Sequence, residues 1–231
     1  MSELNQGRKL LMPTAYLPPV SYMAWLSVAD EIEVEIHETY PKQTLRNRCT
    51  IASTNGPLNL SIPVEKPLGN HTPTNLIRAS NHTHWKRQHW KSIESAYRKA
   101  AYFIHYNDVL EPYYASNLNE SLLVEWNMIL LQSLCKAIGL EKKISYTSTF
   151  VKIPEGIIDL RSALNSKNFE RTQLPEDVNI TYFQSFSEKY GFLPNLSIID
   201  ALFHLGPDTL QYIRNCGIRQ LNFLSKPNLS G

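Results

Sequence analysis

The residues best suited to chemistry are gathered in one polar segment, His37–Arg48, which reads His-Glu-Thr-Tyr-Pro-Lys-Gln-Thr-Leu-Arg-Asn-Arg. It combines an imidazole, a carboxylate, a phenol, two carboxamides and three cations. Apolar residues alternate with acidic ones just before it, and a second apolar stretch begins at Cys49. A loop that only joined two strands would be shorter and richer in Gly, Asn and Ser. The segment therefore predicts a site for an anionic ligand, or for one that forms many hydrogen bonds.

The three cations of this segment would share one face if residues 42–51 formed a strand, because strand side chains alternate between two faces. They are Lys42, Arg46 and Arg48. Guanidinium groups pair bidentately with phosphates and carboxylates, so we expect this row to hold the anionic groups of a ligand. The alternative is a solvated strand face whose cations protect a sheet edge. The amides of Gln43 and Asn47 on the opposite face favour a ligand site.

His37 and Glu38 are the candidates for acid–base catalysis. Imidazole is the side chain that titrates most readily near neutral pH, and a carboxylate can also accept a proton. Neighbours in an extended chain point to opposite sides, so these two would not orient each other directly. Either residue can therefore be the base, and the alternative is that one of them caps the loop.

Three histidines, His82, His84 and His89, lie close together in the sequence near two tryptophans. Histidines that bind metal from one helix are usually spaced four apart, and here no Cys or carboxylate completes a set, so we expect no metal site. His89 is expected to line a groove or to cover the edge of the core. Tyr97 and the nearby aromatic residues could stack on a sugar or base, although aromatics at helical spacing are usually core residues.

Familiar phosphate-binding and nucleophile motifs are missing. The chain has no Gly-x-Gly-x-x-Gly and no Gly-x-x-x-x-Gly-Lys-Ser/Thr, and its serines lack Gly-x-Ser-x-Gly surroundings. The sequence therefore names no cofactor.

A strand–helix–strand unit is predicted to position the polar segment. Lys9–Met12 is a short apolar strand, residues 22–29 show helical spacing, and residues 31–36 alternate strictly, with the glutamates on the outer face. This order predicts a βαβ unit with parallel strands. Ligands of open α/β sheets bind beyond the carboxyl ends of the strands. The loop that contains Tyr16 leaves the first strand and the polar segment leaves the second, so we expect the two loops to converge.

A hairpin and two short strands are expected outside this unit. Asn55-Gly56 is a strong turn signal between two apolar stretches. Residues 76–79 and 147–152 could each form a further strand.

Helices are expected to dominate the second half. Apolar residues recur at three- and four-residue steps over residues 85–106 and 118–138, and Gly139 is placed to end the second helix. Residues 159–178 read as a long polar excursion. Short helices are expected over residues 183–190 and 198–212, the latter capped by Asn195-Leu-Ser197.

Length and composition favour a single mixed α/β domain over residues 1–231, with a mostly sheet-forming part (1–80) and a mostly helical part (81–231), and the alternative is at most two small domains. The net charge of +2 gives no reason to expect nucleic acid as a partner. The three cysteines form no CxxC pair, which fits a reducing compartment. The longest apolar stretch carries charges, and prolines interrupt the first one, so we expect no membrane span or signal peptide and a cytoplasmic location.

Several stretches of the chain together match a known family. They are Thr14-Ala-Tyr-Leu-Pro-Pro19 with Tyr22, Glu35–Arg48, Asn55-Gly56 with Leu60–Val64, His89-Trp90 with Ser95-Ala-Tyr97, and Gly191-Phe-Leu-Pro-Asn-Leu-Ser-Ile-Ile-Asp200. On these stretches the chain resembles the WbqC-like protein family, and specifically the branch found in Bacteroidetes-type bacteria. The resemblance implies a bacterial protein of surface-polysaccharide (O-antigen) biosynthesis, for which amino-acid transfer, glycine in particular, has been suggested. Many members carry His-Gln-Pro where this chain has Leu11-Met12-Pro13, which shifts any catalytic role to His37, Glu38 or His89.

Three hypotheses follow. In the first, the protein is a transferase that moves an acyl or aminoacyl group from a phosphate-bearing donor to a glycan precursor. The residues expected to bind this anionic substrate are Tyr16, Lys42, Gln43, Arg46, Asn47, Arg48, His89 and Tyr97. In the second, it is a nucleotidyltransferase-like enzyme, as its opening strand, proline-rich loop and helix indicate, although the paired His-x-Gly-His of that class is missing. In the third, it is a non-catalytic binding or assembly protein whose polar loop docks an acidic partner.

Overall fold

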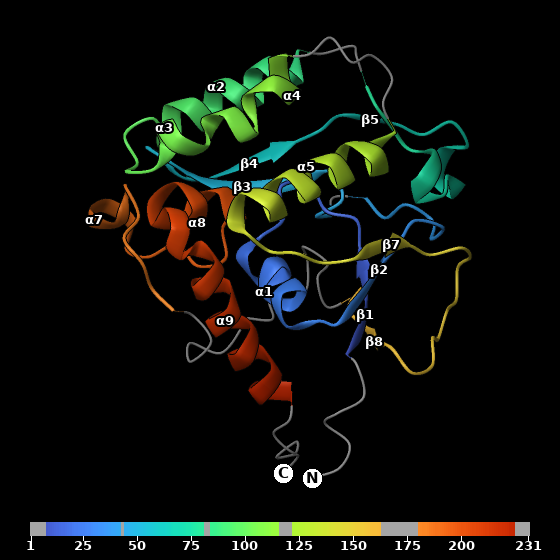
Figure 1. The fold of residues 1–231 in the computed structure, drawn as a ribbon. Coiled ribbons are helices and arrows are strands. Elements are labelled where there is room, and N and C mark those ends of the chain that lie inside the picture. Colours follow the sequence, from blue (N-terminus) through green and yellow to red (C-terminus); the bar gives the residue numbers. More distant parts are fainter. Residues whose placement is uncertain (1–7, 43, 81–83, 116–121, 163–179, 225–231) are drawn as a thin grey trace, which may run out of the picture.

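A parallel four-stranded sheet lies beside helices that come from both halves of the chain (Figure 1). The computed structural model describes residues 8–42, 44–80, 84–115, 122–162 and 180–224. The strands of this sheet are β1 (Lys9–Pro13), β2 (Glu31–Glu35), β7 (Ile144–Tyr146) and β8 (Ile158–Asp159), in the order β7-β2-β1-β8. Helix α1 (Val20–Val28) connects β1 to β2, which run parallel. The predicted βαβ unit is therefore confirmed.

Burial explains the different patterns of the two central strands. In β2, Ile32 and Val34 are buried whereas Glu31 and Glu33 are not, so the strand covers the core with one face. In β1, Leu10, Leu11 and Met12 are all buried, because the strand has a neighbour on each side and packed layers on both faces.

Two smaller antiparallel pairs complete the strands. The hairpin consists of β3 (Arg48–Ser53) and β4 (Gly56–Ser61), and the second pair of β5 (Val64–Glu65) and β6 (Arg78–Ala79). Gly56 has a φ of +92°, which a residue with a side chain rarely adopts, so the Asn55-Gly56 signal predicted the turn correctly.

The rest of the described chain is mainly helical, as expected. The helices are α2 (Trp85–Tyr97), α3 (Phe103–Tyr106), α4 (Glu111–Ala115), α5 (Leu123–Ile138), α7 (Ser187–Tyr190), α8 (Ile198–Leu205) and α9 (Thr209–Leu224). Short 3-10 turns cover Gly69–His71, Thr74–Leu76, Asn107–Val109 and Gly206–Asp208. In Figure 1, α2 and α4 lie along the hairpin, whereas α1 and α9 pack together beside the parallel sheet. Gly139, at a φ of +76°, ends α5 as predicted.

Three expectations about the elements are wrong. The strand expected over residues 147–152 is found earlier, as β7, because the chain leaves the sheet after the amide of Thr147 bonds to the carbonyl of Val34. The helix expected over residues 85–106 breaks after Tyr97, and Ile104 is 76% exposed rather than buried. The helix predicted over residues 198–212 is split at Gly206 into α8 and α9.

The cap expected from Asn195-Leu-Ser197 acts on a different helix. Ser197 donates its hydroxyl to the Leu17 carbonyl, 2.9 Å away, and makes no cap bond to α8. Asn195 Oδ1 instead accepts from the amide of Ser21 at 3.0 Å, so it caps α1. Most of the polar excursion expected over residues 159–178 lies outside the described residues.

Gly217 of α9 allows this helix to pack closely against α1. A Cβ atom added to Gly217 would lie 2.5 Å from the Ala24 carbonyl oxygen, so the two helix backbones meet at this point. Helix propensity alone would make Gly217→Ala stabilising by about 1 kcal/mol. Overpacking against a rigid backbone costs about 1–3 kcal/mol, so we expect a net loss of up to about 2 kcal/mol in the free energy of unfolding, measured by urea denaturation. Asn222→Ala at an exposed position of α9 is the control, and a stabilised Gly217→Ala variant would contradict the close approach.

Candidate functional site at the carboxyl edge of the sheet

The order of the parallel strands points to the edge where a ligand would bind. The order β7-β2-β1-β8 means that the chain adds strands on one side of β1 and then moves to its other side. Ligands of open α/β sheets bind at such a switch, beyond the carboxyl ends of the strands. Here these ends are Pro13, Glu35, Tyr146 and Asp159.

The loops that follow β1 and β2 meet at this edge, as predicted. The amide of Tyr16 donates to the carbonyl of Leu45 at 2.8 Å. Asn127 of α5 bridges the same loops, because its Nδ2 donates to Thr14 Oγ1 at 3.1 Å and to the Arg46 carbonyl at 2.7 Å. A buried side-chain amide thus fixes the two loops relative to each other.

The predicted row of cations is wrong. Strand β3 begins only at Arg48, so the alternation assumed for residues 42–51 does not hold for the first part. Lys42 is exposed, and Arg48 is half-buried with its Nε bonded to Ser61 Oγ at 3.0 Å. Arg46 is 1% exposed and points inward instead. Gln43 lies outside the described residues.

Arg46 forms a buried ion pair with Glu38. Its Nε lies 2.8 Å from Glu38 Oε1, and its Nη2 contacts the same oxygen. Nη1 is buried and has no hydrogen-bond partner among the described residues. Burial raises the pKa of Glu38, although the Arg46 charge opposes this shift. The guanidinium is therefore held along one edge, and its other end is left without an acceptor.

The hydroxyl of Tyr40 is a second buried donor with no partner in the described part of the chain. Burial raises the pKa of this phenol, whereas the charges of Arg46 and Arg48 act in the opposite direction. The hydroxyl therefore lies within electrostatic reach of both arginines. A phenol and a guanidinium that lack an acceptor can each donate a hydrogen bond to an anionic group, and these two donors are called the anion cradle below.

A second buried ion pair was missed by the sequence analysis. Glu35, at the end of β2, is fully buried and accepts a hydrogen bond of 3.1 Å from Nη1 of Arg161. The Thr147 hydroxyl and the His37 amide bond to its other oxygen, at 3.1 and 2.7 Å. Burial would raise the pKa of Asp159, but hydrogen bonds from Arg161 hold it below its usual value. Strand alternation had placed Glu35 outward, and only the long-range contacts with Thr147 and Arg161 explain its burial.

His37 has both ring nitrogens next to polar groups. Its Nε2 lies 2.9 Å from the Thr147 carbonyl, so this nitrogen carries the proton. Its Nδ1 then faces the Asn75 amide nitrogen at 3.5 Å. This arrangement ties the loop after β2 to the chain after β7.

Tyr16 and His89 belong to a buried aromatic cluster under α2. The Tyr16 hydroxyl lies 2.9 Å from His89 Nδ1 and 2.6 Å from the Tyr114 hydroxyl. Trp85 packs edge-on against both Tyr16 and His89. Burial lowers the pKa of His89 to about 4, so this imidazole is neutral at physiological pH. These side chains bond to one another and not to the side chain of Arg46.

Tyr97 takes part in a third polar cluster around Asp200 of α8. Its hydroxyl donates to Asp200 Oδ2 at 2.9 Å and accepts from the Ala52 amide at 3.1 Å. Tyr182 and Gln184 donate to Oδ1 of the same carboxylate, at 2.6 and 3.1 Å. Sequence analysis missed this cluster, although an aspartate within the apolar run of α8 was a usable signal.

Asn47 is tied to the hairpin rather than to the ion pair. Its Nδ2 donates to the Ile62 carbonyl at 2.8 Å, and its Oδ1 is buried with no partner in the described chain. Among residues 8–42, 44–80, 84–115, 122–162 and 180–224, no three His, Cys, Asp or Glu side chains are grouped to hold a metal ion. No helix within these ranges is long and apolar enough to cross a membrane.

The fold and the site define a mixed α/β protein in which buried ion pairs line the carboxyl edge of a parallel sheet. The chain belongs to the WbqC-like protein family, whose model matches residues 14–212. It is 24% identical over 233 residues to "Uncharacterized protein Rv1507c" of Mycobacterium tuberculosis (strain ATCC 25618 / H37Rv), a match that covers 89% of this chain and 97% of that protein. No solved structure is significantly similar.

The depressed pKa of His89 predicts a pH dependence of stability. The unfolded chain takes up a proton on this residue near pH 6.5, whereas the folded protein does so only near pH 4. Stability is therefore lost as the pH falls through this window, by roughly 3 kcal/mol from this residue. We expect His89→Gln to lose less stability than the natural protein between pH 7 and pH 4, measured by urea denaturation. The exposed His71, replaced in the same way, is the control, and identical slopes in all three proteins would refute the assignment.

Proposed function

We propose that the protein is a transferase of surface-polysaccharide biosynthesis. It moves an acyl or aminoacyl group, such as glycine, from a phosphate-bearing donor to a glycan precursor. The resemblance to WbqC-like proteins described above supports the pathway and the transferred group. The stretches that carry it also support the branch of Bacteroidetes-type bacteria, and the free cysteines Cys49, Cys135 and Cys216 support a cytoplasmic location.

One observation carries the proposal: the guanidinium of Arg46 is buried, fixed by Glu38 along its Nε–Nη2 edge, and without an acceptor at Nη1. A buried donor without a partner costs about 1–3 kcal/mol, so such a group marks the place where an acceptor belongs. A phosphate oxygen fits because it is anionic and accepts several bonds. The Tyr40 hydroxyl supplies the second donor.

Glu38 is the proposed general base. Burial raises its pKa, which makes its carboxylate a stronger base, and Arg46 holds the side chain in place through one oxygen. In the proposed reaction, the acceptor hydroxyl or amine gives its proton to Glu38 as it attacks the donor carbonyl. The phosphate leaves with the bonding electrons, and Arg46 and Tyr40 stabilise the charge that it gains.

The second candidate is a nucleotidyltransferase-like enzyme, which the topology favours. The order β7-β2-β1-β8 has the same pattern as one half of a dinucleotide-binding sheet, in which the ligand lies at the switch beside the first strand. A thermal-shift screen separates the two functions. Stabilisation by ATP or CTP, but not by acetyl phosphate or UDP-glucose, would favour nucleotidyl transfer.

Tyr40→Phe tests the anion cradle with the smallest change. Because the hydroxyl is buried without a partner, its removal should leave the stability of the free protein unchanged or increase it. Pyrophosphate should bind about 10- to 100-fold more weakly, since a hydrogen bond to a charged group is lost. Calorimetric titration with pyrophosphate measures the dissociation constant, and urea denaturation measures the stability.

Two further variants control this experiment. Tyr190→Phe removes a phenol hydroxyl that bonds to the Thr54 carbonyl at 2.8 Å, and it should not change pyrophosphate binding. Arg46→Lys keeps the charge but loses the planar fork, so binding should weaken strongly. Equal affinities in Tyr40→Phe, Arg46→Lys and the natural protein would refute the cradle.

Glu38→Gln separates binding from chemistry. The amide keeps the shape of the side chain but cannot accept a proton, and it removes the negative charge beside Arg46. Pyrophosphate should therefore bind as well as before or more tightly, while turnover with the donor found in the screen falls about 10²- to 10⁴-fold. Turnover of the natural protein should also fall as the pH drops below the raised pKa of Glu38. An active Glu38→Gln variant would remove Glu38 from the mechanism.

A further inference from the structure

A cavity of about 630 Å³ lies at the opposite edge of the parallel sheet, between the C-terminal half of α5 and the start of β7. Ligand pockets commonly have volumes of about 300–1,000 Å³. Ile144, the first residue of β7, lines the cavity, and Lys142 bonds to the Ala29 carbonyl just before β2. This places the cavity at the amino ends of the strands, away from Arg46 and Glu38.

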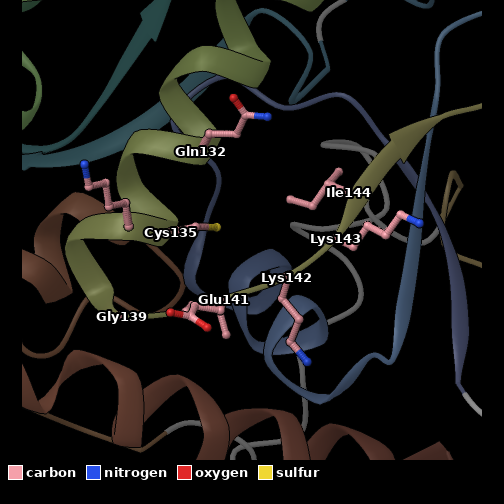
Figure 2. Close-up of a pocket in the computed structure, with 9 residues that line it drawn as sticks. Gln132, Cys135, Gly139, Glu141, Lys142, Lys143 and Ile144 are labelled. Carbon is pink, nitrogen blue, oxygen red and sulfur yellow. The ribbon is translucent and has the colours of Figure 1, made fainter.

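The interior of the cavity is mostly apolar. Cys135 and Leu140 are buried, and Ile144 is partly buried. Figure 2 shows the Cys135 sulfur and the Ile144 side chain directed toward each other across the space, with the Gln132 amide above them. Such walls suit an aliphatic chain, because burial of methylene groups is favourable and no buried polar group would lose a partner.

The rim of the cavity is positively charged. Three of the lining residues are lysines, Lys136, Lys142 and Lys143, against one glutamate, Glu141. The C-terminus of α5 adds about half a negative charge, which is too little to cancel this excess.

Lys142 is the best placed of these cations. Burial lowers its pKa; the carboxylate of Asp30 opposes this shift, whereas the nearby charges of Arg214 and Arg8 add to it. Its ammonium group donates one hydrogen bond to the Ala29 carbonyl. An ammonium has three donors, so two remain for a ligand.

We propose that this cavity binds an amphiphilic anion, with an aliphatic chain among Cys135, Leu140 and Ile144 and a phosphate or carboxylate head at Lys142. The inference is independent of the proposed transferase activity, because it uses none of the same side chains. The aliphatic chain and the anionic head of such a ligand each contribute to its binding free energy, and ligands that lack one of them measure the two contributions separately.

Titration calorimetry with alkyl phosphates below their micelle concentrations tests the proposal. Octyl phosphate should bind about 15-fold more tightly than hexyl phosphate, which corresponds to about fourfold for each additional methylene. It should also bind at least tenfold more tightly than octanol, which lacks the charged head, or than inorganic phosphate, which lacks the chain. Octanoate distinguishes a carboxylate from a phosphate head.

Two variants locate the binding. Gln132→Trp fills the space from an exposed position of α5, so it should fold normally and weaken octyl phosphate binding at least tenfold. Gln88→Trp, at an exposed position of α2, is its control. Lys142→Met keeps the length of the side chain and should weaken octyl phosphate but not octanol. Tyr40→Phe should have no effect, so failure of the proposed function would not be confused with failure here.

Any one of three results of these binding experiments would overturn the proposal. Equal binding of octanol and octyl phosphate would show that no anionic head is recognised. Unchanged binding in both Gln132→Trp and Lys142→Met would place the ligand elsewhere. The absence of saturable binding of octyl phosphate and octanoate to the folded natural protein would rule the site out.

Discussion

A buried carboxylate, Glu35, holds the carboxyl edge of the sheet together. A charge removed from water costs several kcal/mol unless it is paired and hydrogen-bonded, and Glu35 is fully buried. Its partners come from three places: the polar segment through His37, the chain after β7 through Thr147, and the chain after β8 through Arg161. Because β7 and β8 are only three and two residues long, their backbone bonds alone would fix them weakly. The hydrogen bonds that Thr147 and Arg161 make to the buried carboxylate of Glu35 therefore help to fix the carboxyl ends of these outer strands.

The two ion pairs at this edge differ in how completely they are satisfied. Arg161 uses Nε and both terminal nitrogens, which bond to Asp159, Glu35 and the Lys152 carbonyl. Arg46 leaves Nη1 without an acceptor in the described chain, and the hydroxyl of Tyr40 is in the same situation. An ion pair whose donors all have acceptors serves the fold, whereas one with an unused donor can also bind a ligand. This difference, rather than the number of charges, distinguishes the Arg46–Glu38 pair as the candidate site.

Local signals in the sequence were sufficient to predict the helices, strands and turns. They were not sufficient to predict which charged side chains are buried. The Asn55-Gly56 turn, the Gly139 cap and the alternation of residues 31–34 in β2 each depend on a few neighbouring residues, and all three are observed. Arg46 was placed on a row of cations that faces a ligand or solvent because alternation was extended into a loop. Glu35 was placed outward because its partners, Thr147 and Arg161, lie 112 and 126 residues further along the chain. The convergence of the loops after β1 and β2 was predictable from the order of the parallel strands. The ion pairs that form at this edge were not.

Helix α5 is the element common to both edges of the sheet. Near its start, Asn127 bonds to the loops after β1 and β2, and near its end Cys135 lines the cavity. Eight residues of helix separate these positions by about 12 Å, a distance that a regular α-helix keeps fixed. A substitution that shifts α5 therefore disturbs both the carboxyl edge of the sheet and the cavity, so its effect does not report on one of them alone. Tyr40 and Lys142 lie outside α5, so substitutions there act on one edge without moving the element that connects it to the other.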